Sequence, residues 1–147
     1  MDAILHLMPL LLIGVSVVLV LLTWGARQRR VQQAIDAGFE VLRITDGEPP
    51  LRGADLRVVA ERRMLMTAQS QDGFGPTSSN EVRSEYFLYC VGPGPSWFLA
   101  IALVNDRGWW RTIDVDWIVR ALDETRMRGA LAGDAEALRA AGLIADT

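Results

Sequence analysis

The sequence has no lysine, and cysteine and histidine occur once each, as Cys90 and His6. Single residues of these two types exclude a disulfide framework and a metal cluster built only from His and Cys within one chain. Catalysis through a Ser–His or Cys–His pair requires a histidine beside the nucleophile. Because His6 lies in the apolar N-terminal segment and Cys90 in a distant apolar run, we expect no such pair and interpret Cys90 as a buried free thiol.

The lack of lysine also excludes the G-x-x-x-x-G-K-[S/T] phosphate-binding loop. The GPGP sequence at 92–95 is no substitute, because proline has no N–H group to bind a phosphate oxygen. The formal net charge of -3 argues against nucleic acid as a partner, since phosphate neutralisation needs a basic surface. We therefore predict that the chain binds no nucleic acid and no cofactor.

Carboxylates are the remaining ligands for a metal ion, and the sequence TIDVD offers Asp114 and Asp116. A D-x-D pair can hold Mg²⁺ when further oxygens converge on it. At the start of a helix such a pair more often caps the helix and offsets its dipole, so we predict neither a metal site nor catalytic residues. A carboxylate-dependent enzyme stays as an alternative interpretation.

An apolar run near the N-terminus decides the class of protein. From Ala3 to Trp24, 22 residues, no side chain carries a full charge at neutral pH. A helix of this length spans about 33 Å, against roughly 30 Å for the hydrocarbon core of a bilayer. A cleaved signal peptide is disfavoured, because no positive side chain precedes the run and no A-x-A site follows it. We predict an uncleaved transmembrane helix over residues 3–24.

The residues beside this run predict its orientation. Asp2 is the only charged side chain before it, whereas Arg27, Arg29 and Arg30 follow it closely. Basic residues stay on the cytoplasmic side of a membrane, and Trp24 suits the headgroup level. The sequence therefore predicts a single-pass protein of the bacterial inner membrane, with its N-terminus outside and its C-terminal domain in the cytoplasm. Trp24 and the three arginines would form the membrane anchor.

Beyond the membrane we expect the helix to continue over residues 25–38, where an apolar stripe would dock on the domain that follows. Gly38 suits the position just past a helix end. Residues 39–147 then form one small cytoplasmic domain, which begins with a short strand at Phe39–Thr45. The stripe consists of Val31, Ala34 and Ile35.

Apolar runs predict a β-meander in the middle of this domain. The stretch 56–68 fits a strand better than a helix, although its pattern allows both. Glu85–Val91 and Trp97–Val104 flank a Gly/Pro-rich connection, which indicates a hairpin. Both runs are apolar at odd and even positions, so we expect both faces of the sheet to be covered. A mobile polar loop at 69–82 precedes the hairpin, and a further strand at 109–113 follows it.

The C-terminal part is predicted to be helical. Asp114 is the expected N-cap of a helix over 114–131, which would carry a buried stripe and a solvated ladder of alternating charge. A second short helix would be capped by Asp134 and end at Gly142. The fold class is therefore α+β: one transmembrane helix, then an antiparallel meander of four or five strands closed by C-terminal helices. The stripe is Val115, Ile118, Val119 and Leu122, and the ladder is Asp116, Arg120, Glu124 and Arg128.

Four tryptophans, at positions 97, 109, 110 and 117, fall within 21 positions of the chain. In a strand, the adjacent Trp109 and Trp110 point to opposite faces, so one of them needs a cover outside the core: a helix, lipid headgroups or a partner. Tryptophan and arginine are enriched at interface hot spots, which makes Trp109, Trp110 and Arg111 the candidate interaction face. The alternative, in which the protein itself covers both tryptophans, stays open.

Together these features favour a non-catalytic accessory protein. Its helix would hold a small interaction domain under the inner membrane, and we expect the lipid bilayer and an unidentified protein of a membrane complex as partners. A membrane-tethered module that senses lipid or a ligand is the first alternative, and the carboxylate-dependent enzyme is the second.

Overall fold

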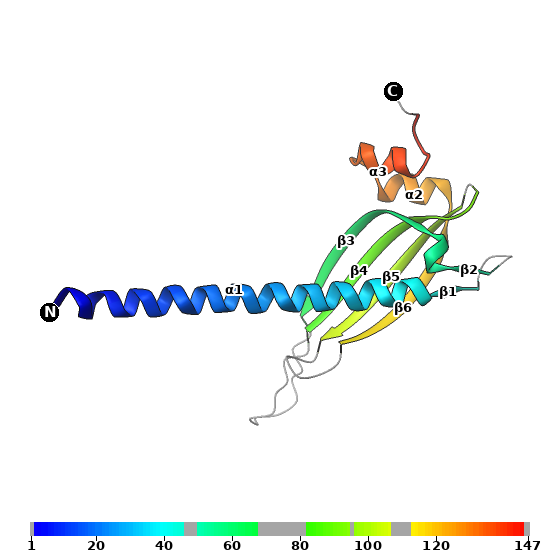
Figure 1. Ribbon diagram of the computed structural model, residues 1–147. Coiled ribbons are helices and arrows are strands. Elements are labelled where there is room, and N and C mark those ends of the chain that lie inside the picture. Colours follow the sequence, from blue (N-terminus) through cyan, green and yellow to red (C-terminus); the bar gives the residue numbers. More distant parts are fainter. Residues whose placement is uncertain (1, 46–49, 68–81, 95, 107–112, 146–147) are drawn as a thin grey trace. The chain divides into compact units, whose positions relative to one another are not determined.

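The computed structural model describes residues 2–45, 50–67, 82–94, 96–106 and 113–145. In these residues one long helix precedes a two-stranded pair, a four-stranded antiparallel sheet and two short C-terminal helices (Figure 1). The predicted α+β class with an antiparallel meander is confirmed. By internal contacts, residues 1–33 and 34–147 form two separate compact units. In chain order the elements are α1 (Asp2–Val41), β1 (Arg43–Ile44), β2 (Leu51–Arg52), the 3-10 turn η1 (Gly53–Asp55), β3 (Arg57–Thr67), β4 (Val82–Val91), β5 (Trp97–Asp106), β6 (Ile113–Leu122), α2 (Glu124–Ala130) and α3 (Ala135–Ala140).

Helix α1 is continuous and contains both the apolar run and the stripe predicted after it. In the stripe, Val31 and Ile35 are 8% and 1% exposed, and Ala34 is half-buried. The spacing of three and four residues therefore places these side chains on one buried side of the helix, as predicted.

The predicted end of this helix at Gly38 and the predicted strand at Phe39–Thr45 are wrong. Helix α1 continues to Val41, and only Arg43–Ile44 of the stretch forms a strand. The physical reason is that Gly38 and Phe39 lie four residues beyond Ala34 and Ile35 and extend the same buried stripe, so packing of that stripe favours one more helical turn.

The four long strands pair in the order β3-β4-β5-β6, each antiparallel to the next. The predicted hairpin is confirmed, because β4 and β5 pair over their full lengths around the Gly/Pro-rich turn. Strand β3 confirms the strand interpretation of the stretch 56–68. A β-bulge between Val58 and Ala60 turns these two residues to opposite faces of the sheet.

The helix predicted to start at Asp114 is wrong, because Ile113–Leu122 is strand β6. The stretch satisfies a helical spacing, but its β-branched and aromatic residues also alternate with period two, which suits a strand. Pairing with β5 along the whole strand decides between the two. The next helix begins after Asp123, whose carboxylate accepts a hydrogen bond of 2.7 Å from the N–H of Arg126.

The predicted charge ladder is split by this correction. Asp116 and Arg120 lie on β6, where side chains four residues apart are not neighbours on a helix face. Glu124 and Arg128 do lie on α2, and their side chains are 2.8 Å apart. The prediction therefore holds for the second half of the ladder.

The predicted cap and stop of the last helix are confirmed. The carboxylate of Asp134 accepts a hydrogen bond of 2.9 Å from the N–H of Ala137, at the start of α3. Gly142 has a φ of 71°, the left-handed conformation that commonly follows a helix end and favours glycine.

One face of the four-stranded sheet forms the main core, and we call it the closed face. Ala102 of this face pairs with Trp117 of β6, whose ring centroid lies 5.7 Å from that of Phe39. Gly38 permits this approach, since a Cβ atom there would lie only 2.8 Å from Nε1 of Trp117. The last turns of α1 therefore pack on the closed face. Its buried residues on β4 and β5 are Tyr86, Leu88, Cys90, Phe98, Ala100, Ala102 and Val104.

Two predictions fall outside the described residues. The loop at 69–82 lies outside them except for Val82, which begins β4. The strand predicted at 109–113 lies outside them except for Ile113, which begins β6.

Candidate interaction surface

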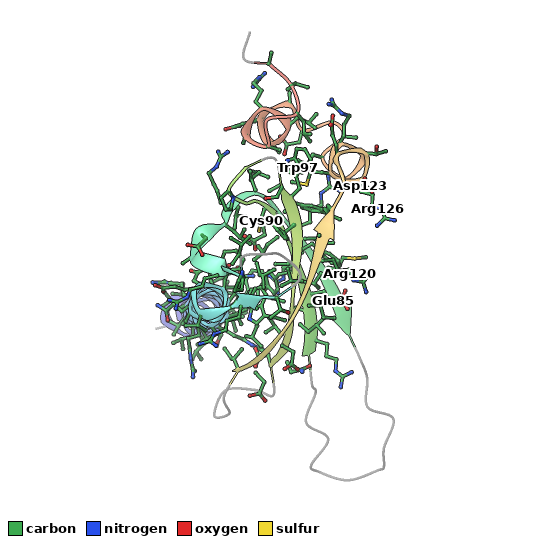
Figure 2. The ribbon with its side chains drawn as sticks, turned by 90° about the vertical axis from the view of Figure 1, so that its right-hand side faces the viewer. Glu85, Cys90, Trp97, Arg120, Asp123 and Arg126 are labelled. Carbon is green, nitrogen blue, oxygen red and sulfur yellow. The ribbon has the colours of Figure 1, made fainter. Side chains whose placement is uncertain are left out.

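The face of the sheet opposite to the closed face is the candidate site, and we call it the open face. Figure 2 shows Glu85 and Arg120 projecting from the side of the sheet opposite to Cys90. The pairing registers place the same alternate positions of all four strands on this side. Its residues are Ala60, Arg62 and Met64 of β3, Glu85, Phe87 and Tyr89 of β4, Leu99, Ile101 and Leu103 of β5, and Asp116, Ile118 and Arg120 of β6.

Helices α2 and α3 cover one end of the open face (Figure 1). The indole Nε1 of Trp97 donates a hydrogen bond of 3.0 Å to the carbonyl of Ala141, and the guanidinium of Arg57 donates to the carbonyl of Ala140. These bonds attach the end of α3 to the sheet. The apolar core beneath the helices consists of Met127, Leu131, Ala137, Ala141 and Leu143, packed against Val59, Ala60, Tyr89, Val91, Trp97, Leu122 and Leu138.

Beyond these helices, the middle of the open face is an apolar patch that no described element covers. Ile118 is 39% exposed and Met64 is 59% exposed, and Phe87, Ile101 and Leu103 are half-buried. The solvated face of an antiparallel sheet normally carries polar residues at alternate positions. Apolar residues on adjacent strands at the centre of this face are therefore typical of a surface that contacts another molecule.

Four charged side chains border this patch, two basic and two acidic. Arg62 is held toward the covered end, with its guanidinium carbon 5.8 Å from the centre of the Tyr89 ring. Arg120 and Asp116 are exposed on β6, on either side of Ile118. Glu85 completes the set. The border carries no net charge and so offers no electrostatic attraction for an anionic surface.

A hollow opens beside the patch at the end away from α2 and α3. It has a volume of about 360 Å³. The carboxylates of Glu85 and Asp116 border it on either side of Leu103, whose register places it between them. This geometry suits a positively charged side chain that enters from above the sheet. The lining residues are Arg83, Ser84, Glu85, Leu103, Val104, Asn105 and Asp116.

Helix α1 provides a second exposed surface, of a different kind. Among the described residues, α1 is the helix that is long and apolar enough to cross a membrane. Its large apolar side chains between Leu12 and Leu22 are 50–65% exposed. The hydroxyls of Ser16 and Thr23 donate hydrogen bonds of 2.8 Å to carbonyls within the helix. Polar groups satisfied inside the helix are what a hydrocarbon environment requires.

The predicted anchor residues follow this apolar surface along α1. Trp24 is 62% exposed, Arg29 and Arg30 are exposed, and Arg27 is half-buried. Their role as an anchor stays a prediction.

The predicted interaction face of Trp109, Trp110 and Arg111 lies outside the described residues. The other two tryptophans of the cluster are covered by the protein itself: Trp97 by the end of α3, and Trp117 by the end of α1.

The residues considered for chemistry are two carboxylates on one strand and one buried thiol. Asp114 and Asp116 lie exposed on β6, and the described part of the chain contains no group of three His, Cys, Asp or Glu residues that could hold a metal ion. Cys90 is 0% exposed, and burial raises the pKa of its thiol to about 12. The thiol is therefore protonated at neutral pH, and its interpretation as buried and free is confirmed.

The sequence pattern did not predict Ile118, Phe87, Ile101 and Leu103 as members of an exposed patch. For the last three, the apolarity of both faces of the hairpin is the available signal, but it predicts two covered faces as readily as one exposed apolar face. Ile118 was assigned to the buried stripe of a helix that does not exist there.

Comparison with known proteins adds no function: no family model, no curated protein and no solved structure matches the chain. The open face and α1 are therefore the features that bear on function.

Proposed function

We propose that the chain is a single-pass inner-membrane protein that presents the open face of its sheet to a protein partner in the cytoplasm, as a non-catalytic accessory component. The observation that carries this proposal is the uncovered apolar patch around Ile118, which is 39% exposed. A patch of this kind, rimmed by polar residues, is typical of a protein interface.

The exposed apolar surface of α1 supports the membrane part of the proposal. The large apolar side chains from Leu12 to Leu22 are at least half exposed, and the span is 0% buried among the described residues. In a bilayer these side chains contact lipid, and the cluster of Arg27, Arg29 and Arg30 keeps the following residues on the cytoplasmic side.

The charges of the open face favour a protein over a lipid surface as the partner. Binding to anionic lipid needs an excess of basic side chains near the headgroups. The two arginines that border the patch are balanced by Glu85 and Asp116, so a mixed protein surface is the better complement.

Labelling of introduced cysteines tests the orientation. Glu40 is exposed in the last turns of α1, and a membrane-impermeant maleimide should label a Glu40→Cys variant only after the host cells are permeabilised. An Asp2→Cys variant is the matched control and should be labelled in intact cells. Cys90 is buried and gives no background. Labelling of Glu40→Cys in intact cells would place the domain outside, and release of the protein by alkaline carbonate would refute the membrane span.

A photoreactive amino acid at position 118 tests the use of the open face. In native membranes we expect it to form adducts with protein, whereas the same group at position 40, on α1, should form few or none. Adducts with lipid alone would support the lipid-sensing alternative and contradict the proposed function.

A further inference from the structure

The open face carries a pattern that is symmetric about one residue. On β6, Asp116 and Arg120 lie two positions before and two positions after Ile118, and all three side chains are exposed on the same face. Opposite charges at equal distances from a central apolar residue are self-complementary. Consider two copies stacked face to face, with a two-fold axis that lies between the sheets, perpendicular to the strands and level with Ile118. This axis would put each Arg120 opposite the other copy's Asp116.

We propose that the partner of the open face is a second copy of this chain, packed face to face across this axis. The inference rests on the proposed function, because it names the partner of the same patch. It accounts for the apolar residues that lie in register with Ile118. Ile118 pairs with Ile101, and Ile101 pairs with Phe87, so each of these three residues meets its counterpart in the second copy.

The neighbouring positions on β5 also match under this rotation. Leu99 and Leu103 lie two positions before and after Ile101 on the open face. The rotation exchanges them, so a leucine of one copy meets a leucine of the other on both sides of the axis.

The hollow beside Leu103 receives the one long side chain that the rotation brings to it. Arg120 of the second copy arrives opposite Asp116, at the border of the hollow of about 360 Å³. Glu85 forms the other acidic border of that hollow. A guanidinium placed there can pair with the carboxylate of Asp116, a geometry in which arginine forms two parallel hydrogen bonds.

Arg62 is the residue that could oppose the pairing, since it lies in register with Phe87 near the axis. Its guanidinium does not extend straight out from the sheet but is held over the ring of Tyr89, at 5.8 Å, toward the covered end. The rotation sends the two covered ends in opposite directions, so the two Arg62 guanidinium groups move apart.

The size of the patch explains why the pairing depends on the membrane. Because α2 and α3 cover the open face from Tyr89 and Leu122 onward, four strands about 4.8 Å apart can share only about four residues each, on the order of 260 Å² per copy. A stable complex in solution usually buries about 800 Å² per partner. Two copies anchored in one membrane meet at a high effective concentration, and a smaller interface then suffices.

Cross-linking of charge-reversal variants of the full-length protein in native membranes tests the inference. Ile118→Cys should be cross-linked into a dimer by a short homobifunctional maleimide, since the two residues face each other at the axis across sheets about 10 Å apart, which is too far for a direct disulfide. Buried Cys90 stays unreactive. Added to this variant, Asp116→Arg or Arg120→Asp should each reduce the dimer yield about tenfold, because both replace two attractions by two repulsions. Coexpression of the two charge variants, carrying tags of different size, should restore a mixed dimer to near the original yield.

Glu40→Arg is the matched control: it reverses an exposed charge outside the open face, and we expect an unchanged dimer yield. Protection of Cys90 from alkylation confirms that each variant is folded. If neither charge reversal lowers the dimer yield, or if coexpression of the two variants does not restore it, the second-copy inference is wrong. If position 118 instead forms adducts only with a different protein, this inference is wrong while the proposed function stands. If it forms no protein adduct, both are wrong.

Discussion

The two faces of the four-stranded sheet are made by the same strands but are covered differently. On the closed face, Ala100 and Ala102 are 0% exposed, and the end of α1 packs beside them against Trp117. On the open face the corresponding positions of β5 carry the larger Leu99, Ile101 and Leu103, which are only half-buried. Small side chains let a helix approach one face closely, whereas bulky side chains on the other form a raised apolar surface.

This difference separates stability from recognition. Residues of the closed face are packed within the chain, so they stabilise a single copy against unfolding. Residues of the open face beyond α2 and α3 keep part of their apolar surface exposed until another surface covers them. Substitutions on the two faces should therefore affect different measurements.

The largest effect is expected from truncation of a leucine on the closed face. Leu88 is 4% exposed, and Leu88→Ala should lower the free energy of unfolding by about 2–5 kcal/mol, since it leaves a cavity in the core. Leu103→Ala on the open face should cost less, about 1–2 kcal/mol, because that side chain stays partly exposed. Denaturant titration of the full-length protein in mild detergent measures both. Equal losses for the two variants would mean that the open face is packed within a single copy.

An intermediate effect is expected at the contact between α1 and the closed face. A Cβ atom at Gly38 would lie 2.8 Å from Nε1 of Trp117, whereas one at Gly14 would have nothing within 4 Å. Gly38→Ala should therefore destabilise the protein by roughly 1–3 kcal/mol, partly offset by about 1 kcal/mol of helix propensity. Gly14→Ala gains the propensity without the clash. Thermal unfolding followed by tryptophan fluorescence compares them, and a stabilised Gly38→Ala variant would contradict the observed packing of Trp117.

Local patterns predicted much of this fold because, in several segments, the spacing of apolar residues fits a helix or a strand but not both. The hairpin of β4 and β5 follows from two apolar runs around a Gly/Pro-rich turn, and Asp134 and Gly142 bound α3 as their side-chain and backbone chemistry requires. The stripe of Val31 and Ile35 is also set by local spacing. In each case the residues that decide the structure are close in sequence.

The errors arose where distant contacts decide the structure. In β6, Val115, Ile118 and Val119 satisfy a helical stripe and equally a strand pattern, and pairing with β5 settles the choice. Phe39 continues α1 because Trp117 lies against it, far along the chain. The open face was missed for the same reason: which face of an evenly apolar strand stays uncovered depends on where α1 and the C-terminal helices pack.

The smallest effect concerns the cap of α2, the helix that covers one end of the open face. The carboxylate of Asp123 accepts a hydrogen bond of 2.7 Å from the N–H of Arg126, and Asp123→Ala should cost about 1 kcal/mol. Asp114, which the sequence suggested as a cap, lies exposed on β6, so Asp114→Ala should change the free energy of unfolding by less than about 0.5 kcal/mol. Denaturant titration under identical conditions decides between them. A larger loss for Asp114→Ala would indicate that the end of β6 is helical after all, while equal small losses would show that α2 does not depend on its cap to close that end of the sheet.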